Sequence, residues 1–213
     1  MMQEISKKQI HKNEKESKIM GRESFHYAWV TDEMEEERER GVTIDVGVRK
    51  ISLKDRNIVF LDSPGHRDFI PNMITGAAQA DYAILVIDAT HFDSTFISGG
   101  QTKEHAYIVK SLGVHQIIVA MNKMDLVDWS PEAFLKIQKK LNYYLLDIGF
   151  QEDNIVYVPI SAFYGTNILD TRKEPFVAGE TVYEKSLIQV LSELYLPVRP
   201  IDKPLRVNIT NFY

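Results

Sequence analysis

The sequence predicts an α/β fold built around a mostly parallel sheet with helices on its faces. Short apolar runs alternate along the chain with helical patterns, which is typical of repeated strand–helix–strand units. Of the 213 residues, 44% are hydrophobic and 26% are charged, an ordinary globular composition. The length allows one large domain, or one domain with part of a second. These features exclude a disordered tail, a collagen-like rod and a coiled coil.

The individual elements follow from apolar runs and from helix-capping signals. The predicted strands are Val46–Leu53, Ile58–Asp62, Ala83–Asp88, Ile117–Asn122 and Ile155–Pro159. The predicted helices are Asn72–Ala80, Thr102–Leu112, Pro131–Ile148 and Lys185–Tyr195. Ser130 followed by Pro131 is a natural helix start, and Gly149 is a natural helix stop.

The two ends of the chain differ from this pattern. Met1–Met20 mixes charges of both signs and reads as a surface helix. Leu196–Pro204 carries three prolines and reads as a linker, after which Leu205–Ile209 alternates as a new strand would.

Charge and residue usage exclude several classes of function. The formal net charge is −5, so the chain as a whole is not an electrostatic binder of nucleic acid, and no DNA partner is expected. There is no cysteine, which excludes disulfides, thiolate zinc sites and cysteine nucleophiles. No apolar run reaches the roughly 18 residues needed to cross a bilayer.

The first candidate site follows the strand Ile58–Asp62. Asp62 at a strand end can hold Mg²⁺, often through water. Pro64 and Gly65 make a turn in which a backbone N–H can approach a phosphate closely, and His66 projects beside that phosphate. By itself the segment Asp62–His66 is equally compatible with a strand end, a turn and a helix cap that have no function in binding.

Two further candidate loops follow the strands that end at Asn122 and Pro159. The carboxylate of Asp125 can accept two parallel hydrogen bonds from the N1–H and N2–H₂ edge of guanine, a donor pair that adenine lacks. Asn122 would brace this loop, and the stem of Lys123 would lie along the base. In the second loop, small residues would let a backbone N–H reach the guanine O6. That loop is Ser161–Ala162–Phe163.

A fourth element precedes the first strand. Thr43, at the end of Arg38–Thr43, would offer its hydroxyl to Mg²⁺ and its N–H to a γ-phosphate, in a loop that orders with a triphosphate. Each motif alone also fits an ordinary polar loop. Three motifs in order at one sheet edge favour recognition of a guanine nucleotide.

The sequence closely resembles the translational GTPases of the elongation-factor-one-alpha class over nearly its whole length. The matching runs are Gly21–Val30 (GRESFHYAWV), Glu36–Thr43 (EERERGVT), Asp62–Ala80 (DSPGHRDFIPNMITGAAQA) and Gly100–Gly113 (GQTKEHAYIVKSLG). Within the class it is most similar to the Hbs-type ribosome-rescue GTPases. That similarity rests on His11–Lys18 (HKNEKESK), Asp45–Gly47, Phe69–Asn72 and Val127–Trp129.

The resemblance implies GTP/GDP and Mg²⁺ as ligands. Thr43 and Asp62 would attend Mg²⁺, Gly65 would sense the γ-phosphate, and His66 would position or stabilise the attacking water, a role that a glutamine fills in other GTPases. Guanine would be held by Asn122, Lys123, Asp125 and Ser161 with its neighbours Ala162 and Phe163.

The resemblance also implies partners and a location. The ribosome and a tRNA-mimicking factor of the Pelota type would be the partners, in the cytoplasm. The alternatives are an elongation factor that delivers aminoacyl-tRNA, a termination-factor GTPase, the GTPase subunit of a sulfate-activating enzyme, and a non-catalytic degenerate fragment.

The family's phosphate-binding loop, G-x-x-x-x-G-K-[ST], is missing from this sequence. None of the eleven glycines is followed by lysine. We therefore expect a truncated G domain of the P-loop NTPase type over residues 1–198, which lacks its first strand and P-loop. A linker would cover 199–204 and the first strand of a β-barrel domain 205–213. Nucleotide binding would be impaired, and Ile58–Asp62 and Ala83–Asp88 would expose apolar edges that destabilise the chain.

Overall fold

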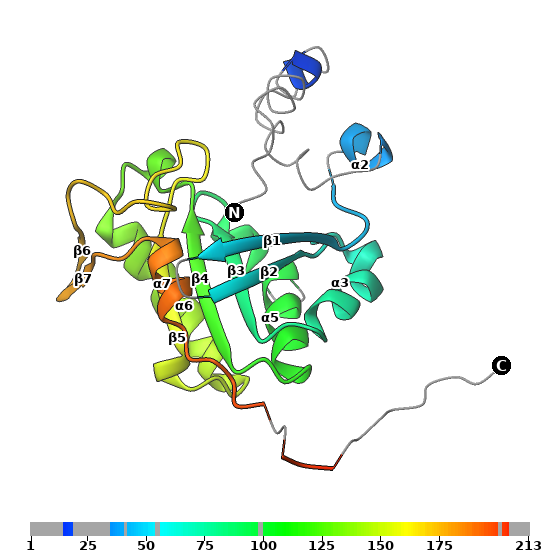
Figure 1. Ribbon diagram of the computed structural model, residues 1–213. Coiled ribbons are helices and arrows are strands. Elements are labelled where there is room, and N and C mark those ends of the chain that lie inside the picture. Colours follow the sequence, from blue (N-terminus) through cyan, green and yellow to red (C-terminus); the bar gives the residue numbers. More distant parts are fainter. Residues whose placement is uncertain are drawn as a thin grey trace.

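The computed structural model describes residues 15–18, 35–40, 42–53, 56–97, 100–199 and 202–204. Within them, three strands form a parallel sheet in the order β3–β4–β5, and two antiparallel pairs lie beside it (Figure 1). The parallel strands are β3 (Tyr82–Asp88), β4 (Gln116–Asn122) and β5 (Ile155–Pro159). The antiparallel pairs are β1 (Gly47–Leu53) with β2 (Arg56–Asp62), and β6 (Phe176–Ala178) with β7 (Thr181–Tyr183).

Strand β4 is the centre of the core. Its residues from Ile117 to Met121 are at most 1% exposed, because helices cover both faces of the sheet. A strand buried on both faces needs a continuous apolar run rather than an alternating one. The sequence Ile-Ile-Val-Ala-Met meets that requirement.

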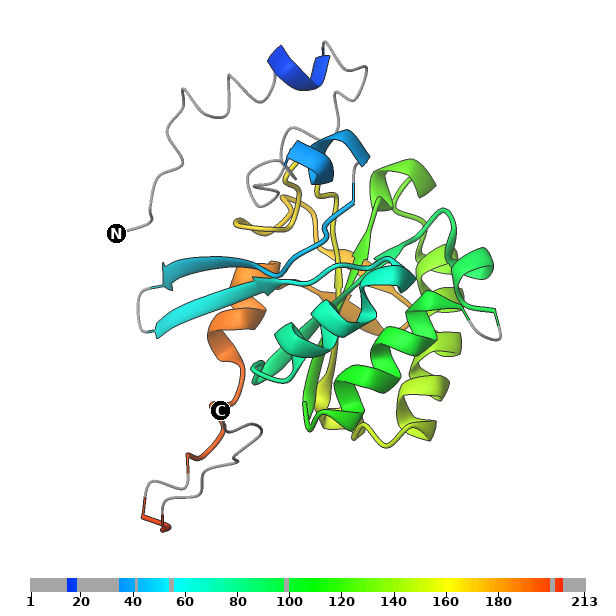
Figure 2. The same ribbon diagram turned by 90° about the vertical axis from the view of Figure 1, so that its right-hand side faces the viewer.

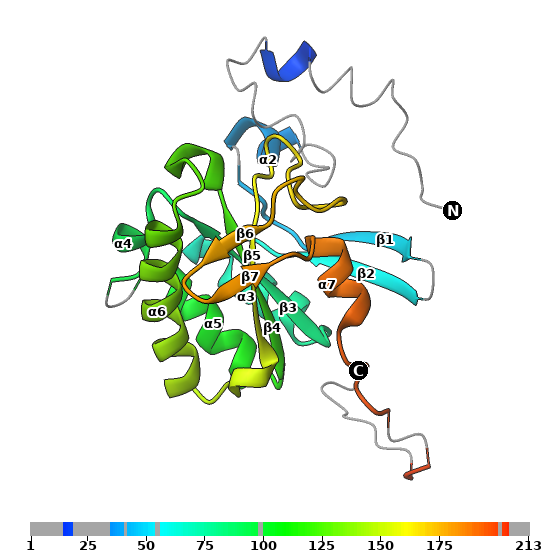
Figure 3. The same ribbon diagram turned by 90° about the vertical axis from the view of Figure 1, so that its left-hand side faces the viewer.

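The two faces of the sheet carry separate clusters. Ile117, Val119 and Met121 pack in the cluster with α5 (Gln101–Ser111) and α6 (Pro131–Asp147). Ile118 and Ala120 pack in the cluster with α7 (Leu187–Glu193). Figures 2 and 3 show α5 and α6 along one side of the sheet and α7 on the other.

Helix α6 shows how local sequence builds one of these layers. Pro131 occupies its first turn, and the Ser130 side chain accepts a hydrogen bond from the N–H of Ala133 at 3.2 Å. Four buried side chains then repeat at helical spacing, one to each turn. They are Phe134, Ile137, Leu141 and Leu145.

Strands β2 and β3 do not pair with each other in the described part of the chain. Each belongs to a different sheet, and a cavity of about 1960 Å³ is lined by both, as well as by α3 (Ile70–Ala77) and α5. Val59 and Val86 lie half or more exposed in the middle of these strands, at 50% and 60%. The described structure therefore has the open apolar edges expected for these two strands.

The sequence predicted the larger elements to within three residues at each end. It missed the β6–β7 hairpin and the single-turn helix α4 (Phe92–Thr95), because three or four residues are too few to establish a period. Trp129 packs against the core, 6.2 Å from the ring of Phe176.

Several expectations fall wholly or partly on residues outside the described ranges. Residues 15–18 are helical, as is α2 (Glu35–Arg40), but most of Met1–Met20 and all of the expected strand 205–213 lie outside the described residues. No helix in the described part of the chain is long and apolar enough to cross a membrane.

Candidate functional site

The carboxyl ends of β3, β4 and β5 meet at one edge of the parallel sheet. Asp88 at the end of β3 lies in register with Asn122 at the end of β4, and the N–H of Ala89 donates to the carbonyl of Asn122 at 3.0 Å. β5 ends beside Met121 in the same way. This edge is where ligands bind in open α/β sheets, and it carries all the residues predicted to recognise guanine.

The Asn122 side chain ties two of the predicted loops together. Its Oδ1 accepts hydrogen bonds from the N–H of Lys123 at 2.8 Å and from the N–H of Ala162 at 2.9 Å. One amide oxygen therefore bridges the loop after β4 and the loop after β5. The predicted bracing by Asn122 is present in the structure. Its predicted contact with the base stays a prediction.

Lys123 makes an ion pair across the same edge. Its Nζ lies 2.6 Å from Oδ2 of Asp88, and its backbone adopts the left-handed region at φ 62°. Partial burial would raise the pKa of Asp88, but hydrogen bonds from Lys123 and Thr90 outweigh it and hold that pKa well below its usual range. The ammonium group is thus engaged by β3, which orients the lysine stem.

Asp125 lies in a short 3-10 turn, Met124–Val127, directly after this loop. The turn is anchored by Met124, whose side chain is fully buried and whose N–H donates to the carbonyl of Ile160 at 3.2 Å. The Asp125 carboxylate is half-buried and forms no hydrogen bond or ion pair with another described residue. Its acceptor oxygens remain available for a ligand.

The loop Ser161–Ala162–Phe163 presents only some of its backbone donors. Ser161 is fully buried, and its N–H donates to the carbonyl of Thr166 at 3.1 Å. The N–H of Ala162 is engaged by Asn122, as above. Phe163 has a side chain that is 58% exposed, and its N–H makes no hydrogen bond within the described residues. Of the three N–H groups, that of Phe163 is the one left for a base oxygen.

The predicted phosphate and Mg²⁺ residues form a second group. Thr43, Asp62, Gly65 and His66 all line the cavity between β2 and β3. None of the six residues predicted to hold guanine lines it. The structure therefore brings the predicted site residues together as two groups rather than one.

The group offers oxygen donors that suit Mg²⁺. The Thr43 hydroxyl and the Asp62 carboxylate are hard ligands, and Mg²⁺ usually takes one or two protein ligands while keeping waters and phosphate oxygens. The described residues contain no cluster of three or more His, Asp or Glu side chains that would suggest another metal site. The donor set thus fits the predicted ion.

The loop that carries Thr43 is held by two side chains that the sequence reasoning missed. Glu37 of α2, only 3% exposed, accepts hydrogen bonds from the N–H groups of Ile44 at 2.8 Å and Asp45 at 3.1 Å. Asn72 of α3 donates to the carbonyl of Ile44 at 2.8 Å and to Asp45 Oδ1 at 3.0 Å. Both lie inside the sequence runs that carry the family resemblance, which was the signal available.

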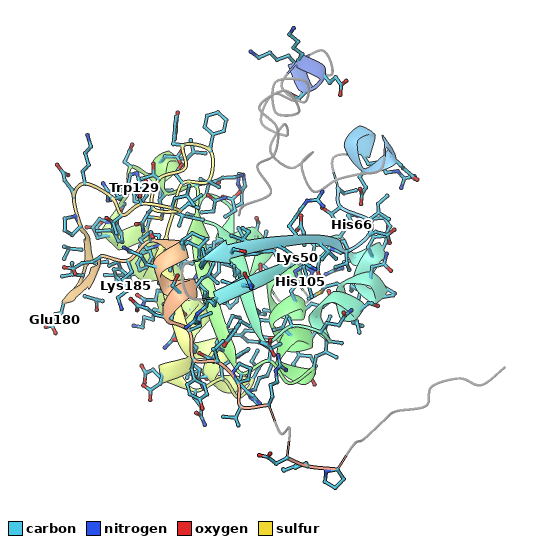
Figure 4. The ribbon with its side chains drawn as sticks, in the orientation of Figure 1. Lys50, His66, His105, Trp129, Glu180 and Lys185 are labelled. Atoms are coloured by element: carbon cyan, nitrogen blue, oxygen red, sulfur yellow. The ribbon has the colours of Figure 1, made fainter. Side chains whose placement is uncertain are left out.

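His66 begins the short turn that leads into α3. Its Nδ1 accepts a hydrogen bond from the N–H of Asp68 at 3.3 Å, and its ring lies 5.9 Å from that of Phe69. About half of its side chain is exposed. Figure 4 shows His66 on the side of the molecule that carries α3 and α5. The imidazole is accessible to a ligand in the cavity that it lines.

Comparisons with known proteins identify relatives of this chain. The chain matches the family described as "Elongation factor Tu GTP binding domain" over residues 1–197. It is 46% identical over 211 residues to Protein HBS1 of Drosophila melanogaster, covering 98% of this chain and 31% of that protein. It is 44% identical over 212 residues to elongation factor 1-alpha of Plasmodium falciparum, covering 98% of this chain and 47% of that protein.

Among solved structures, the fold is similar to the Ski7 GTPase-like domain of S. cerevisiae bound to GTP. The TM-score is 0.71 at 20% identity, over 89% of this chain and 44% of the other. The chain spans 31% and 47% of the lengths of the two curated relatives named above, less than half of each. From the match over residues 1–197, the chain belongs to the family of the elongation factor Tu GTP-binding domain.

Proposed function

We propose that this chain binds a guanine nucleotide and is part of a translation factor that uses GTP hydrolysis as a switch on the ribosome. The observation that carries the proposal is the Asn122 bridge between the loops after β4 and β5. It leaves the Asp125 carboxylate and the Phe163 N–H as an acceptor and a donor at one sheet edge. Guanine offers the complementary pair, a donor edge at N1 and N2 and an acceptor at O6.

The roles at the base follow from these contacts. Asp125 accepts two hydrogen bonds from guanine, and Phe163 donates its N–H to O6, with Ser161 and Ala162 shaping the loop. Lys123, held by Asp88 at 2.6 Å, covers the face of the base with its stem. Adenine has no donor at N1 and an amino group where guanine has O6, so both ends of the site reject it.

The roles at the phosphates rest on the second group. Thr43 and Asp62 hold Mg²⁺, which neutralises phosphate charge when it is bound. Gly65 offers its backbone N–H to the γ-phosphate, and the exposed imidazole of His66 positions the water that attacks it. Glu37 and Asn72 orient the loop that carries Thr43 through their hydrogen bonds to Ile44 and Asp45.

The similarity to Protein HBS1 supports a role in ribosome rescue or mRNA surveillance. The partner that we propose for this role is a tRNA-mimicking factor of the Pelota type, in the cytoplasm. One contact fits this assignment. Asp45 and Asn72, which belong to two of the four Hbs-like runs, hydrogen-bond to each other at 3.0 Å. The 44% identity to an elongation factor 1-alpha supports a second candidate, delivery of aminoacyl-tRNA.

The test of nucleotide binding is an NMR titration of the ¹⁵N-labelled chain with GDP, ADP and XDP, each with Mg²⁺. We expect GDP to shift the amides of Asp125 and Phe163 and ADP to leave them in place. In Asp125→Asn the preference should move from GDP to XDP, because the new amide donates to the xanthine O2. Equal response to all three nucleotides, or none, would contradict the proposal and favour a non-catalytic degenerate chain.

The role in translation needs a separate measurement. Sedimentation with purified ribosomes, with and without a Pelota-type factor, should show co-pelleting that the factor strengthens. Co-pelleting strengthened instead by aminoacyl-tRNA would favour the elongation candidate.

A further inference from the structure

Helix α5 presents two polar side chains, one turn apart, to the loop that follows β2. Gln101 and His105 are four residues apart and so lie on the same helix face. The Nε2 of Gln101 donates to the carbonyl oxygen of Gly65 at 3.1 Å, and the His105 ring lies beside Gly65. Both contacts therefore converge on one glycine, the residue to which we assign the γ-phosphate contact.

The His105 ring is a close neighbour of this glycine. Its Cε1 lies 3.7 Å from the position that a Cβ on Gly65 would occupy. Its Nε2 is buried and has no hydrogen-bond partner among the described residues. Burial lowers the pKa of His105, with Glu104 opposing that shift, so the ring is neutral near pH 7.

The position of Gln101 is fixed. It is the first residue of α5, and a Cβ at the preceding Gly100 would collide with the carbonyl oxygen of Thr95. This close approach fixes where the helix begins and thus where the Gln101 side chain starts. Figure 4 shows His105 on the same side of the molecule as His66, next to α5.

We propose that Gln101 and His105 are positioning residues that hold the Gly65 peptide against α5 and so preorganise the loop 62–66 for the third phosphate of a nucleotide. A peptide unit is planar, so fixing the Gly65 carbonyl also fixes the N–H of His66, which points the opposite way. The proposal rests on the proposed function for the identity of the ligand. The alternative is that the two contacts only pack α5 against the loop.

The consequence separates the two explanations. A preorganised loop lowers the ordering cost of a ligand that contacts it. GDP has no γ-phosphate and does not reach Gly65, so its affinity is independent of the two side chains. A triphosphate does reach Gly65, so loss of one of the two contacts should weaken triphosphate binding by about tenfold. Simple packing would lower stability without changing the ratio of the two affinities.

Each variant removes one of the two contacts. Gln101→Glu keeps the side-chain outline but places an acceptor against the Gly65 carbonyl, and His105→Ala removes the ring beside Gly65. Gln151→Glu makes the same chemical change at an exposed position and serves as the control. NMR measures two properties in each full chain with Mg²⁺. They are the heteronuclear NOE of the Gly65 and His66 amides, and the affinities for GDP and for guanosine 5′-(β,γ-imido)triphosphate.

The expected result is a lower NOE at Gly65 and His66, and a triphosphate affinity about tenfold weaker with GDP affinity unchanged, in Gln101→Glu and His105→Ala alone. We call the pair Gln101 and His105 the Gly65 clamp. An unchanged NOE in both variants would overturn the proposal that this clamp holds the Gly65 peptide. A lower NOE with an unchanged ratio of affinities would overturn its role toward the third phosphate. If the wild-type chain binds neither nucleotide, the proposed function fails, and the link from clamp to ligand fails with it. The NOE then still reports on the clamp independently.

Discussion

Replacing Asn122 by alanine tests the bridge on which the proposed guanine site depends. The change removes one oxygen that accepts two backbone hydrogen bonds, from Lys123 at 2.8 Å and from Ala162 at 2.9 Å. A net hydrogen bond contributes about 0.5–1.5 kcal/mol, so two contribute about 1–3 kcal/mol to the free energy of unfolding. The left-handed backbone of Lys123, at φ 62°, also loses the contact that holds it in place.

Urea unfolding followed by circular dichroism measures this loss. With a slope of about 2 kcal/mol per molar urea, the midpoint should fall by about 0.5–1.5 M. Asn154→Ala is the matched control, because this half-buried asparagine makes no side-chain hydrogen bond with a described residue. Its effect should stay within about 0.5 kcal/mol.

Hydrogen exchange shows whether the loss is local. In Asn122→Ala the amides of Lys123 and Ala162 should exchange faster. The exchange rates of amides in the middle of β4 should change only by the amount that the loss in global stability accounts for. A midpoint equal to that of Asn154→Ala, or an unchanged exchange rate at Ala162, would refute the bridge.

Three other predictions concern the core, the ion pair and the open edge. Phe134→Ala, at a fully buried ring, should lower the free energy of unfolding in urea by about 3–5 kcal/mol. The pKa of Asp88 is held below its ordinary value of 3.8, so its stabilising contribution is complete above that pH and is lost as the pH falls below it. Unfolding measured from pH 6 to pH 2 should show a smaller loss in Lys123→Met than in the wild type. Val86→Lys, on the open edge of β3, should reduce self-association measured by light scattering, and unchanged scattering would contradict the edge as its cause.

The sequence predicted the parallel sheet well because its signals are local and strong. The strand Ile155–Pro159 was predicted with the bounds that the structure has, and α6 to within one residue, since Ser130, Pro131 and Gly149 mark its two ends. The order of the motifs along one sheet edge followed from the strands. That edge holds the guanine-side residues in the structure.

The contacts around the predicted site could not be predicted from the sequence, because they join residues that are far apart in the chain. Glu37 lies in the wholly charged helix α2, a composition typical of an exposed segment, yet it is buried because two backbone N–H groups of another segment satisfy its carboxylate. His105 has no metal-ligand spacing to other residues in the sequence that would single it out. Its contact with Gly65 spans forty residues and depends on how α5 packs. Lys123 was expected along a base, and its ion pair with Asp88 required knowing that β3 and β4 are neighbours.

The two groups of site residues differ in how they are held, and this difference suits a switch. The guanine-side group lies on loops of a continuous parallel sheet whose central strand is buried on both faces. Side-chain hydrogen bonds join these loops. The phosphate-side group lies on the β1–β2 pair and on segments next to α2, α3 and α5, with no strand pairing to the parallel sheet within the described residues. It depends instead on a few polar contacts, from Glu37, Asn72 and Gln101.

A base site should keep one geometry in every nucleotide state. Residues that respond to a third phosphate must instead change conformation at a small cost in free energy. Packing holds the first group, and a small number of hydrogen bonds, each contributing only about 0.5–1.5 kcal/mol, holds the second. A nucleotide contact of similar strength is enough to change the second group without disturbing the first.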